Sequence, residues 1–176
     1  MHGSAEIVDP LDDSHAGNGT PELQRDVDAE RNRSLIAELR GRGVSVESSS
    51  RGVVVTIPDA FFGLDGDVLT QDAVFIVADL AGVLRSSAAN GRRIAVEGHT
   101  DSVGSEEVNR SRSHRRARTV ADALVSRGIA RDILFVRGLG ETLPVEPNVY
   151  PDGFDNPRGR ARNRRVEIVV LNPQQR

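Results

Sequence analysis

The feature that most limits the fold of this chain is the alternation of short β-branched runs with segments of helical period. Residues 53–57 and 94–97 have the length and composition of buried strands, and "DILFVRG" and "RRVEIVVL" supply two more. Strands that alternate with helices and end in a closing strand are typical of a sheet with helices packed against it. The sequence therefore predicts an α/β (α+β) sandwich, with a βαβαβ-type mixed sheet and helices on one face.

Two helical patterns lie between these strands. Thr70 is suited to the N-cap of a helix over residues 70–89, because Asp72 in the first turn is favourable there. The expected buried stripe of this helix is Val74, Val77, Leu80, Ala81 and Leu84. A second helix is predicted over residues 105–126, ended by Gly128. Its buried stripe is centred on Ala117, Val120, Ala121 and Leu124.

The patterns divide the chain into four parts. Residues 1–20 lack periodicity and predict a flexible lead-in with a tag remnant, so we expect a native anchor or export signal upstream. Residues 21–43 have apolar positions at helical spacing and predict an amphipathic helix or stalk. Residues 44–172 are the expected folded domain, which opens with a hairpin over 44–58. Residues 173–176 are a tail.

Composition narrows the classes of function. With 38% hydrophobic and 3% aromatic residues, the core is expected to be aliphatic, with four large aromatic pieces, Phe61, Phe62, Phe75 and Phe135. The absence of cysteine excludes disulfides, thiolate catalysis and cysteine-ligated zinc. A net charge of −3 argues against nucleic acid as a partner. The sequence also contains no run of 18 apolar residues that would predict a membrane span.

Function is expected to concentrate where "GHTDSVGSEE" joins a strand to a helix, because helix starts present unpaired backbone N–H groups. Asn109 and Arg116 are seven residues apart on that helix, which places them about 10 Å apart on nearly the same side, with Ser113 between them. Asp101 should emerge beside them from the strand end. An arginine fork can take a carboxylate and Asp101 an ammonium, so the implied ligand is zwitterionic.

Several of these residues also fit simpler roles. Asp101 equally suits a turn or capping position. His99 and Asp101 alternate like a metal pair, but no third ligand has convincing spacing, so we predict no metal site or other cofactor and a structural His99. The neighbouring arginines are expected to form a solvated helix face: Arg110, Arg112, Arg115 and Arg118.

Six motifs occur in a characteristic order between about residues 52 and 171. They are "VEGHTDSVGS", Asn109, "SHRRARTVADALVSRGI", "RGLGETLP", Asn148 and "NRRVEIVV". In order and spacing they resemble the OmpA-like peptidoglycan-binding domain, which is shared by the C-terminal domain of OmpA, the Pal lipoprotein and the MotB stator protein. The G-H-T-D block, the arginine pair that follows it and N-R-R-V-E-I make the resemblance highly specific.

The resemblance implies non-covalent binding of the peptide stem of peptidoglycan through meso-diaminopimelate, which carries an ammonium and carboxylates. It implies that Asp101 and Arg116 are the principal binding pair. The rest of the implied pocket consists of Thr100, Asn109 and the backbone of Val103, Gly104 and Ser105. Arg165 also matches a family position, and it can either contact the ligand or have a structural role.

Two departures from the family pattern stand out. Arg112 replaces a leucine that the family usually has before the serine of its L-S-x-x-R-A motif, and we expect this side chain to lie in solvent. The loop over 143–163 is longer than the usual version. Tyr150 and Phe154 within it can cover the pocket or contact a partner.

The sequence thus predicts a non-enzymatic module that anchors an envelope protein to peptidoglycan in the periplasm of a Gram-negative-type envelope, with the membrane reached only through a missing N-terminal anchor. The alternative is a scaffold or dimerisation module of a stator or secretion machine, in which the helix predicted over residues 21–43 joins two copies of the chain into a homodimer. A wall hydrolase would need a catalytic acid/base pair or a zinc constellation, which the sequence does not spell out.

Overall fold

The computed structural model describes residues 21–63, 66–86, 89 and 91–173 of the chain. The predicted lead-in and the last three residues of the predicted tail lie outside these ranges. The elements are α1 (Pro21–Leu39), β1 (Ser45–Ser49), β2 (Gly52–Pro58), α2 (Gln71–Leu84), β3 (Ile94–His99), α3 (Glu106–Ser126), β4 (Leu134–Gly140), α4 (Pro157–Asn163) and β5 (Arg165–Leu171), with 3-10 turns η1 (Asp59–Phe61) and η2 (Arg131–Ile133).

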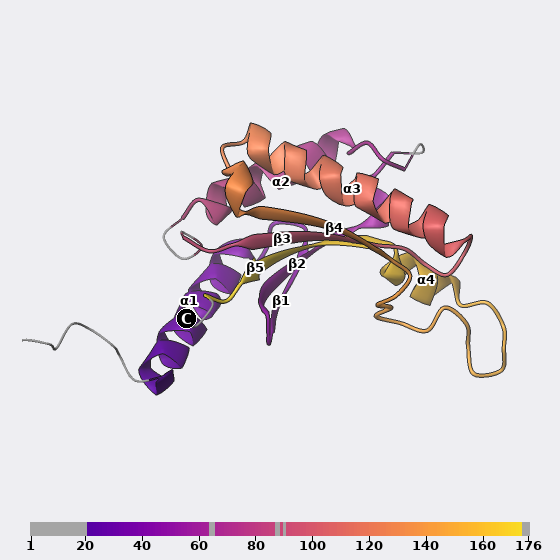
Figure 1. Ribbon diagram of the computed structural model, residues 1–176, viewed down its shortest axis with the longest axis horizontal. Helices are drawn as coiled ribbons and strands as arrows, with labels where there is room; N and C mark the ends of the chain where they lie inside the picture. The colour runs from indigo at the N-terminus through magenta and orange to yellow at the C-terminus, as the bar shows by residue number, and fades with distance from the viewer. Residues whose placement is uncertain (1–20, 64–65, 87–88, 90, 174–176) are drawn as a thin grey trace, which may run out of the picture.

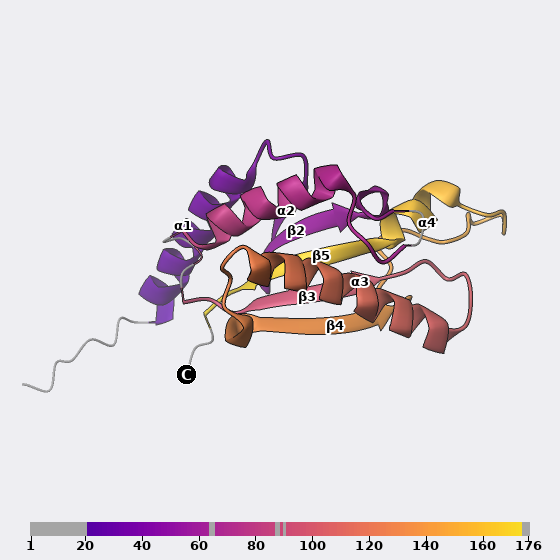
Figure 2. The ribbon, with the colours of Figure 1, turned by 90° about the horizontal axis from the view of Figure 1, so that it is seen from above.

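The strands form one mixed sheet in the order β1-β2-β5-β3-β4. Among the strands of the described residues, β3 and β4 form the one parallel pair, and the connection between them is α3. The last strand, β5, inserts antiparallel between β2 and β3, so the end of the chain completes the centre of the sheet. Helices α2 and α3 lie side by side on one face, whereas α1 lies at the end of the sheet beside β1 (Figures 1 and 2). The predicted mixed sheet with helices on one face is confirmed.

Two glycines allow α3 to rest directly on the sheet. A Cβ atom on Gly98 would lie 1.9 Å from the backbone oxygen of Ser113, and one on Gly138 would lie 2.6 Å from that of Arg110. Real Cβ atoms do not approach so closely, so only glycine fits at these points of β3 and β4. The close approach brings the first half of α3 down onto the strand ends, where the candidate site lies.

The main core fills the space between the sheet and α2 and α3, and it is aliphatic as predicted. Val96, Val120 and Ile168 are fully buried there. Phe62 is buried, but the prediction for Phe75 is wrong, since this side chain is 63% exposed on α2. Val74 likewise faces outward, because Ala73 occupies the buried position of that turn.

The predicted helices differ from the observed ones mainly at their ends. Thr70 caps α2 by accepting from the backbone of Ala73 at 3.3 Å, as predicted, but the helix ends at Leu84 rather than at residue 89. In α1 only the second half packs, since Leu35 and Leu39 are buried whereas Leu23 is exposed. None of the described helices is both long and apolar enough to span a membrane.

One helix, α4, lies within the region predicted to be a loop. Asn156 caps it by accepting from the backbone N–H of Gly159 at 2.9 Å, and Pro157 occupies the first turn, where its missing N–H costs nothing. The Asn-Pro pair was the signal for this helix start. Because α4 runs directly into β5, its arginines are carried to the strand ends beside α3.

Candidate functional site

The site begins where β3 ends and the chain turns into α3. One carboxylate oxygen of Asp101 accepts the backbone N–H of Val103 at 3.1 Å, and Ser105 caps the helix by accepting from Val108 at 3.3 Å. Gly104 has a φ of 104°, a conformation that favours glycine. Asp101 therefore holds the turn, as one of its two predicted roles requires, while its other oxygen points away from this turn.

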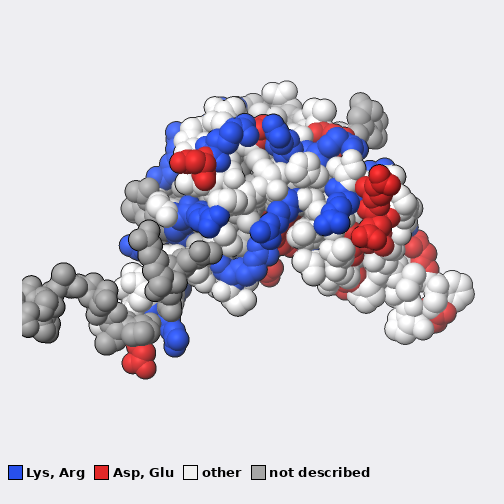
Figure 3. All heavy atoms as spheres, in the orientation of Figure 1, with Lys and Arg blue, Asp and Glu red and all other residues white. Residues whose placement is uncertain are grey.

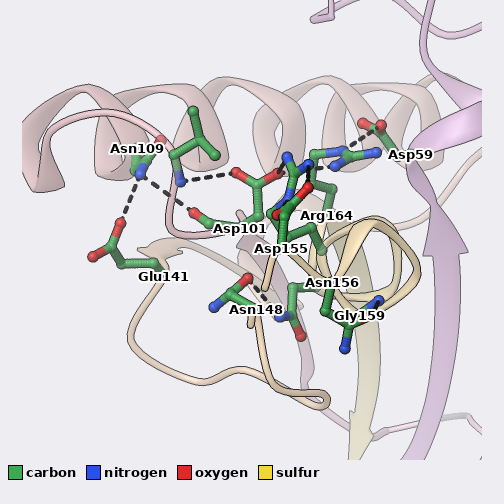
Figure 4. A network of polar contacts seen from close by, with 12 residues as sticks. Asp59, Asp101, Asn109, Glu141, Asn148, Asp155, Asn156, Gly159 and Arg164 are labelled. Carbon is green, nitrogen blue, oxygen red and sulfur yellow. Dashed lines mark hydrogen bonds and ion pairs between the residues drawn. The ribbon is translucent and has the colours of Figure 1, made fainter. Parts of the chain in front are cut away.

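That second oxygen of Asp101 belongs to a chain of ion pairs, which we call the site cluster: Asp59, Asp101, Arg116, Arg160 and Arg164. Arg164 donates to Asp101 at 2.9 Å and to Asp59 at 2.7 Å, and Arg116 donates to the other Asp59 oxygen at 2.6 Å (Figure 4). Arg160 lies 3.5 Å from Asp101. The cluster gathers side chains from η1, the β3–α3 turn, α3 and α4.

Asp101 and Arg116 thus lie in one network without pairing directly. The Asp59 carboxylate lies between Arg116 and Arg164 and is held by both guanidinium groups. Asp101 is only 6% exposed and Arg116 8%, so both are more buried than the edge position that the sequence predicted. Arg116 also donates to the backbone oxygen of Gly66, and its guanidinium lies 5.1 Å from the centre of the Phe62 ring.

Burial lowers the pKa of Arg164, but its hydrogen bonds to Asp59 and Asp101 outweigh burial and raise the pKa above its ordinary value. Its charge is therefore permanent. With Arg116 and Arg160, it makes this side of the site basic.

The opposite side of the site offers acceptors and acidic groups. The buried Asn109 amide donates to the backbone oxygen of Asp101 at 3.3 Å and to Glu141 at 2.7 Å. Its own oxygen has no hydrogen-bond partner among the described residues, and neither has the buried hydroxyl of Thr100. Glu106 and Glu107 follow in the first turn of α3. Figure 3 shows acidic side chains gathered at the end of the molecule where α3 begins, and arginines along the helix.

Arg165 lies apart from this network. It donates to Glu167 at 2.7 Å and to the backbone oxygens of Asn163 and Leu143, each at 3.2 Å. We call its surroundings, on the sheet face opposite the helices, the sheet-face cluster: Arg51, Glu97, His99, Arg165 and Glu167. The structure thus brings together the other predicted site residues but not Arg165, whose neighbour Arg164 lies beside Asp101 instead.

The acidic neighbours of His99 are Glu97 and Glu167 of the sheet-face cluster, and not Asp101, the residue with which sequence spacing paired it. Ligand atoms of Glu97, His99 and Glu167 all lie within 4.8 Å of one another. Arg51 holds Glu97 through two bonds of 2.8 Å, and Arg165 holds Glu167, so a metal ion there would meet two guanidinium groups. Burial, followed by the charge of Arg165, lowers the pKa of His99 to about 4. His99 is therefore neutral near pH 7.

The sequence reasoning missed Asp59, Arg160, Arg164 and Glu141. Arg160 lies on the helix that was not predicted, and Asp59 follows a strand that is far from the motif in sequence. The tandem arginines of "NRRVEI" were noted, but only the end of α4 decides which one turns toward Asp101. The four exposed arginines of α3 do form a solvated face, and Arg112 lies in solvent as predicted.

The described residues thus form an α/β sandwich domain, a mixed sheet with helices on one face and a partly buried cluster of opposite charges at its strand ends. Residues 61–158 match the profile of the OmpA family, which is more than half of the chain. The chain therefore belongs to the OmpA family.

Known proteins extend this comparison. The chain is 42% identical over 109 residues to ArfA of Mycobacterium tuberculosis, described as a peptidoglycan-binding protein, a match over 62% of this chain and 31% of ArfA. Among solved structures, the cell wall anchor of the T6SS from Pseudomonas aeruginosa is 30% identical, with a TM-score of 0.61 over 80% of this chain and 96% of that one. A putative MotB-like protein from Desulfovibrio vulgaris shares the fold, at 23% identity and a TM-score of 0.70 over 86% of this chain and 99% of that one.

The chain spans less than a third of the length of ArfA. The comparison with that protein therefore concerns one part of it, and the activity of the whole does not follow from the match.

Proposed function

We propose that this domain binds peptidoglycan non-covalently through the meso-diaminopimelate of the stem peptide. The observation that supports this most strongly is the bipolar layout of the site. Arg116 and Arg164 surround one carboxylate on one side, and on the other side the Asn109 oxygen, which has no partner among the described residues, lies beside Glu141. Diaminopimelate carries carboxylates and an ammonium, so it can satisfy both sides at once. The description of ArfA as a peptidoglycan-binding protein supports this proposal.

Asp59 indicates where a ligand carboxylate would bind. Its two oxygens accept from Arg116 at 2.6 Å and from Arg164 at 2.7 Å, the arrangement in which two guanidinium groups hold a carboxylate. A ligand carboxylate joins or displaces Asp59 there. Asp59 is partly exposed, which gives it room to move.

The ammonium of the ligand would bind at the other side. The Asn109 oxygen and Glu141 supply the acceptors there, with Asp101 between the two sides, and the Thr100 hydroxyl adds a hydrogen-bonding group whose partner the described residues do not provide. The backbone of Val103, Gly104 and Ser105 follows Asp101 in an exposed turn, where the ligand can reach it. Arg165 contributes by holding Glu167 rather than by contacting the ligand.

In this role the domain is a wall anchor in the periplasm and not an enzyme. Weak binding by one domain suffices, because anchored copies that face a polymeric wall have a high effective concentration. The similarity to the cell wall anchor of the T6SS from Pseudomonas aeruginosa supports this role.

Titration calorimetry tests the proposal with three free stem peptides: one with meso-diaminopimelate, one with its side-chain carboxylate amidated, and one with lysine. We expect binding of the first and at least about tenfold weaker binding of the other two, because each lacks a charged carboxylate for the arginines. Equal binding of all three would contradict diaminopimelate recognition. Binding of none would remove the wall-anchor proposal.

The second candidate is a scaffold of a larger machine that dimerises through α1. It is supported by the exposure of Leu23 and Val27 on the half of α1 that does not pack against the domain. Sedimentation of the wild type and a Leu23→Ser/Val27→Ser variant tests it. A dimer that the substitutions dissociate would support the scaffold, and a wild-type monomer at high concentration would exclude α1 as its interface.

A further inference from the structure

The long loop before α4 ends in a small hairpin whose two aromatic residues, Tyr150 and Phe154, take no part in the proposed stem site. Its turn is "YPDGF", in which the backbone N–H of Gly153 donates to Tyr150 at 2.9 Å and that of Tyr150 donates to Phe154 at 2.8 Å. Gly153 has a φ of 87°. A three-residue hairpin loop that starts with proline and ends in a left-handed glycine is common, so the turn residues match the observed hairpin.

The hairpin places its two aromatic residues opposite each other. Val149 pairs with Asp155 in an antiparallel bridge, and one step nearer the turn the same register pairs Tyr150 with Phe154. Residues directly opposite in an antiparallel pair have Cβ atoms about 5 Å apart on one face. The register therefore places the two side chains on the same face of the hairpin. Tyr150 is 44% exposed and Phe154 72% exposed, although the chain has only six aromatic residues.

Buried asparagines fix this hairpin to the domain. Asn156 donates to the backbone of Pro147 at 2.8 Å, and its backbone N–H donates to Asn148 at 3.0 Å. The fully buried Asn163 donates to the Asn148 side chain at 2.9 Å and accepts from the backbone of Val145 at 2.8 Å. An isolated two-stranded hairpin is marginal in water, so these bonds preorganise the aromatic pair.

The same hairpin is linked to the site cluster by one arginine. Arg160 donates to Asp155 through two bonds of 2.8 and 2.7 Å and lies 3.5 Å from Asp101. Asp155 follows Phe154 directly in the sequence. Figure 4 shows Asp155 and Asn156 on the side of Asp101 that faces the loop. The aromatic pair therefore has a fixed position relative to the proposed stem site.

We propose that Tyr150 and Phe154 form a platform for the sugar rings of the glycan strand, a second binding surface beside the stem site. This inference rests on the proposed function, because a stem peptide is covalently joined to its glycan and brings the sugars within a few residues of the stem site. N-acetylated sugars offer apolar ring faces and methyl groups, which pack on exposed aromatic rings. The preorganised pair provides such a surface without the cost of ordering a loop.

Calorimetry with two probes tests the platform: a free diaminopimelate stem peptide, and the same stem joined to its N-acetylated disaccharide. The wild type should bind the disaccharide-linked stem more tightly than the free stem. A Tyr150→Ser/Phe154→Ser variant should lose about tenfold in affinity for the linked stem and keep its affinity for the free stem, since the lost contacts involve the sugars alone. The matched control is Phe75→Ser, which removes a similarly exposed ring from α2.

The outcomes separate the platform from the stem site. If the double variant binds both probes as the wild type does, the platform is wrong while the stem site stands. If the wild type binds neither probe, both proposals fail. A wild-type dimer that the double variant dissociates, without a change in sugar binding, would show that the aromatic pair joins two copies of this chain and would also overturn the platform.

Discussion

The site cluster and the sheet-face cluster are built from the same residue types but differ in what surrounds them. In both, two or more arginines hold buried or half-buried carboxylates at 2.6 to 2.9 Å. The site cluster is assembled from turns and from helices α3 and α4, and it borders exposed backbone at the start of α3. The sheet-face cluster is assembled from paired strands and the turn between β1 and β2, and its His99 is only 2% exposed.

Charge alone therefore does not identify a binding site, because the two clusters differ in how exposed their ion pairs are. Asp59 and Arg164 are each partly exposed, so their ion pairs can be exchanged for pairs with a ligand. Glu97 is fully enclosed and bonded through both oxygens to Arg51, so the same exchange there would strand a buried charge. The sheet-face cluster therefore fits a structural role, and the site cluster fits a binding role.

The largest expected effect is a loss of folding stability when Gly98 is changed, because both clusters depend on its contact with Ser113 of α3. Gly98 lies between Glu97 and His99 and beneath Ser113, so Gly98→Ala should separate α3 from β3 and cost about 4 kcal/mol or more in unfolding free energy. Urea denaturation would measure it. Gly82→Ala is the matched control, because its Cβ meets nothing within 4 Å and a helical alanine should leave stability equal or higher by up to about 1 kcal/mol. Equal stability of the two variants would refute the close contact.

The next largest expected effect is the dependence of stability on pH, which arises from His99 in the sheet-face cluster. Burial lowers the pKa of His99 from 6.5 to about 4 in the folded protein, so the unfolded chain binds the extra proton between these values. The buried neutral His99 should therefore have no effect on the free energy of unfolding above pH 6.5. As the pH falls from 6.5 to 4, it should lower that free energy progressively, by about 3 kcal/mol at pH 4. Denaturation curves at several pH values should show a shallower acid loss for His99→Gln. The same slope in both proteins would contradict the buried neutral histidine.

A smaller effect, an increase in ligand affinity, is expected when Asp59 of the site cluster is changed. Asp59→Asn removes the carboxylate that Arg116 and Arg164 share, so a ligand carboxylate meets less competition, and affinity for the diaminopimelate stem should rise about threefold to tenfold. Calorimetry measures the change, and Asp122→Asn, an exposed ion-paired aspartate of α3, is the control. Weaker binding by Asp59→Asn would mean that Asp59 positions the arginines for the ligand instead of competing with it.

The fold was largely predictable because its signals are local. Strand runs, the Thr70 cap and the stripe through Val120 follow from periodicity and capping. Phe75 was misplaced because residue type predicts burial only on average, and the α2 stripe is filled by small residues such as Ala73. Asp101, Asn109 and Arg116 were found through a motif within one stretch. Asp59 and Arg164 were not, since only the insertion of β5 beside β2 brings them together.

The most direct test of the account substitutes one arginine in each cluster and measures binding of the free diaminopimelate stem by calorimetry. Arg164 and Arg51 are both partly exposed, and each holds a buried carboxylate, Asp101 and Glu97 respectively. We predict that Arg164→Gln weakens binding about a hundredfold, whereas Arg51→Gln lowers stability and leaves affinity unchanged. Equal loss of affinity in both variants, or a loss in Arg51→Gln alone, would contradict the assignment of the binding site to the site cluster.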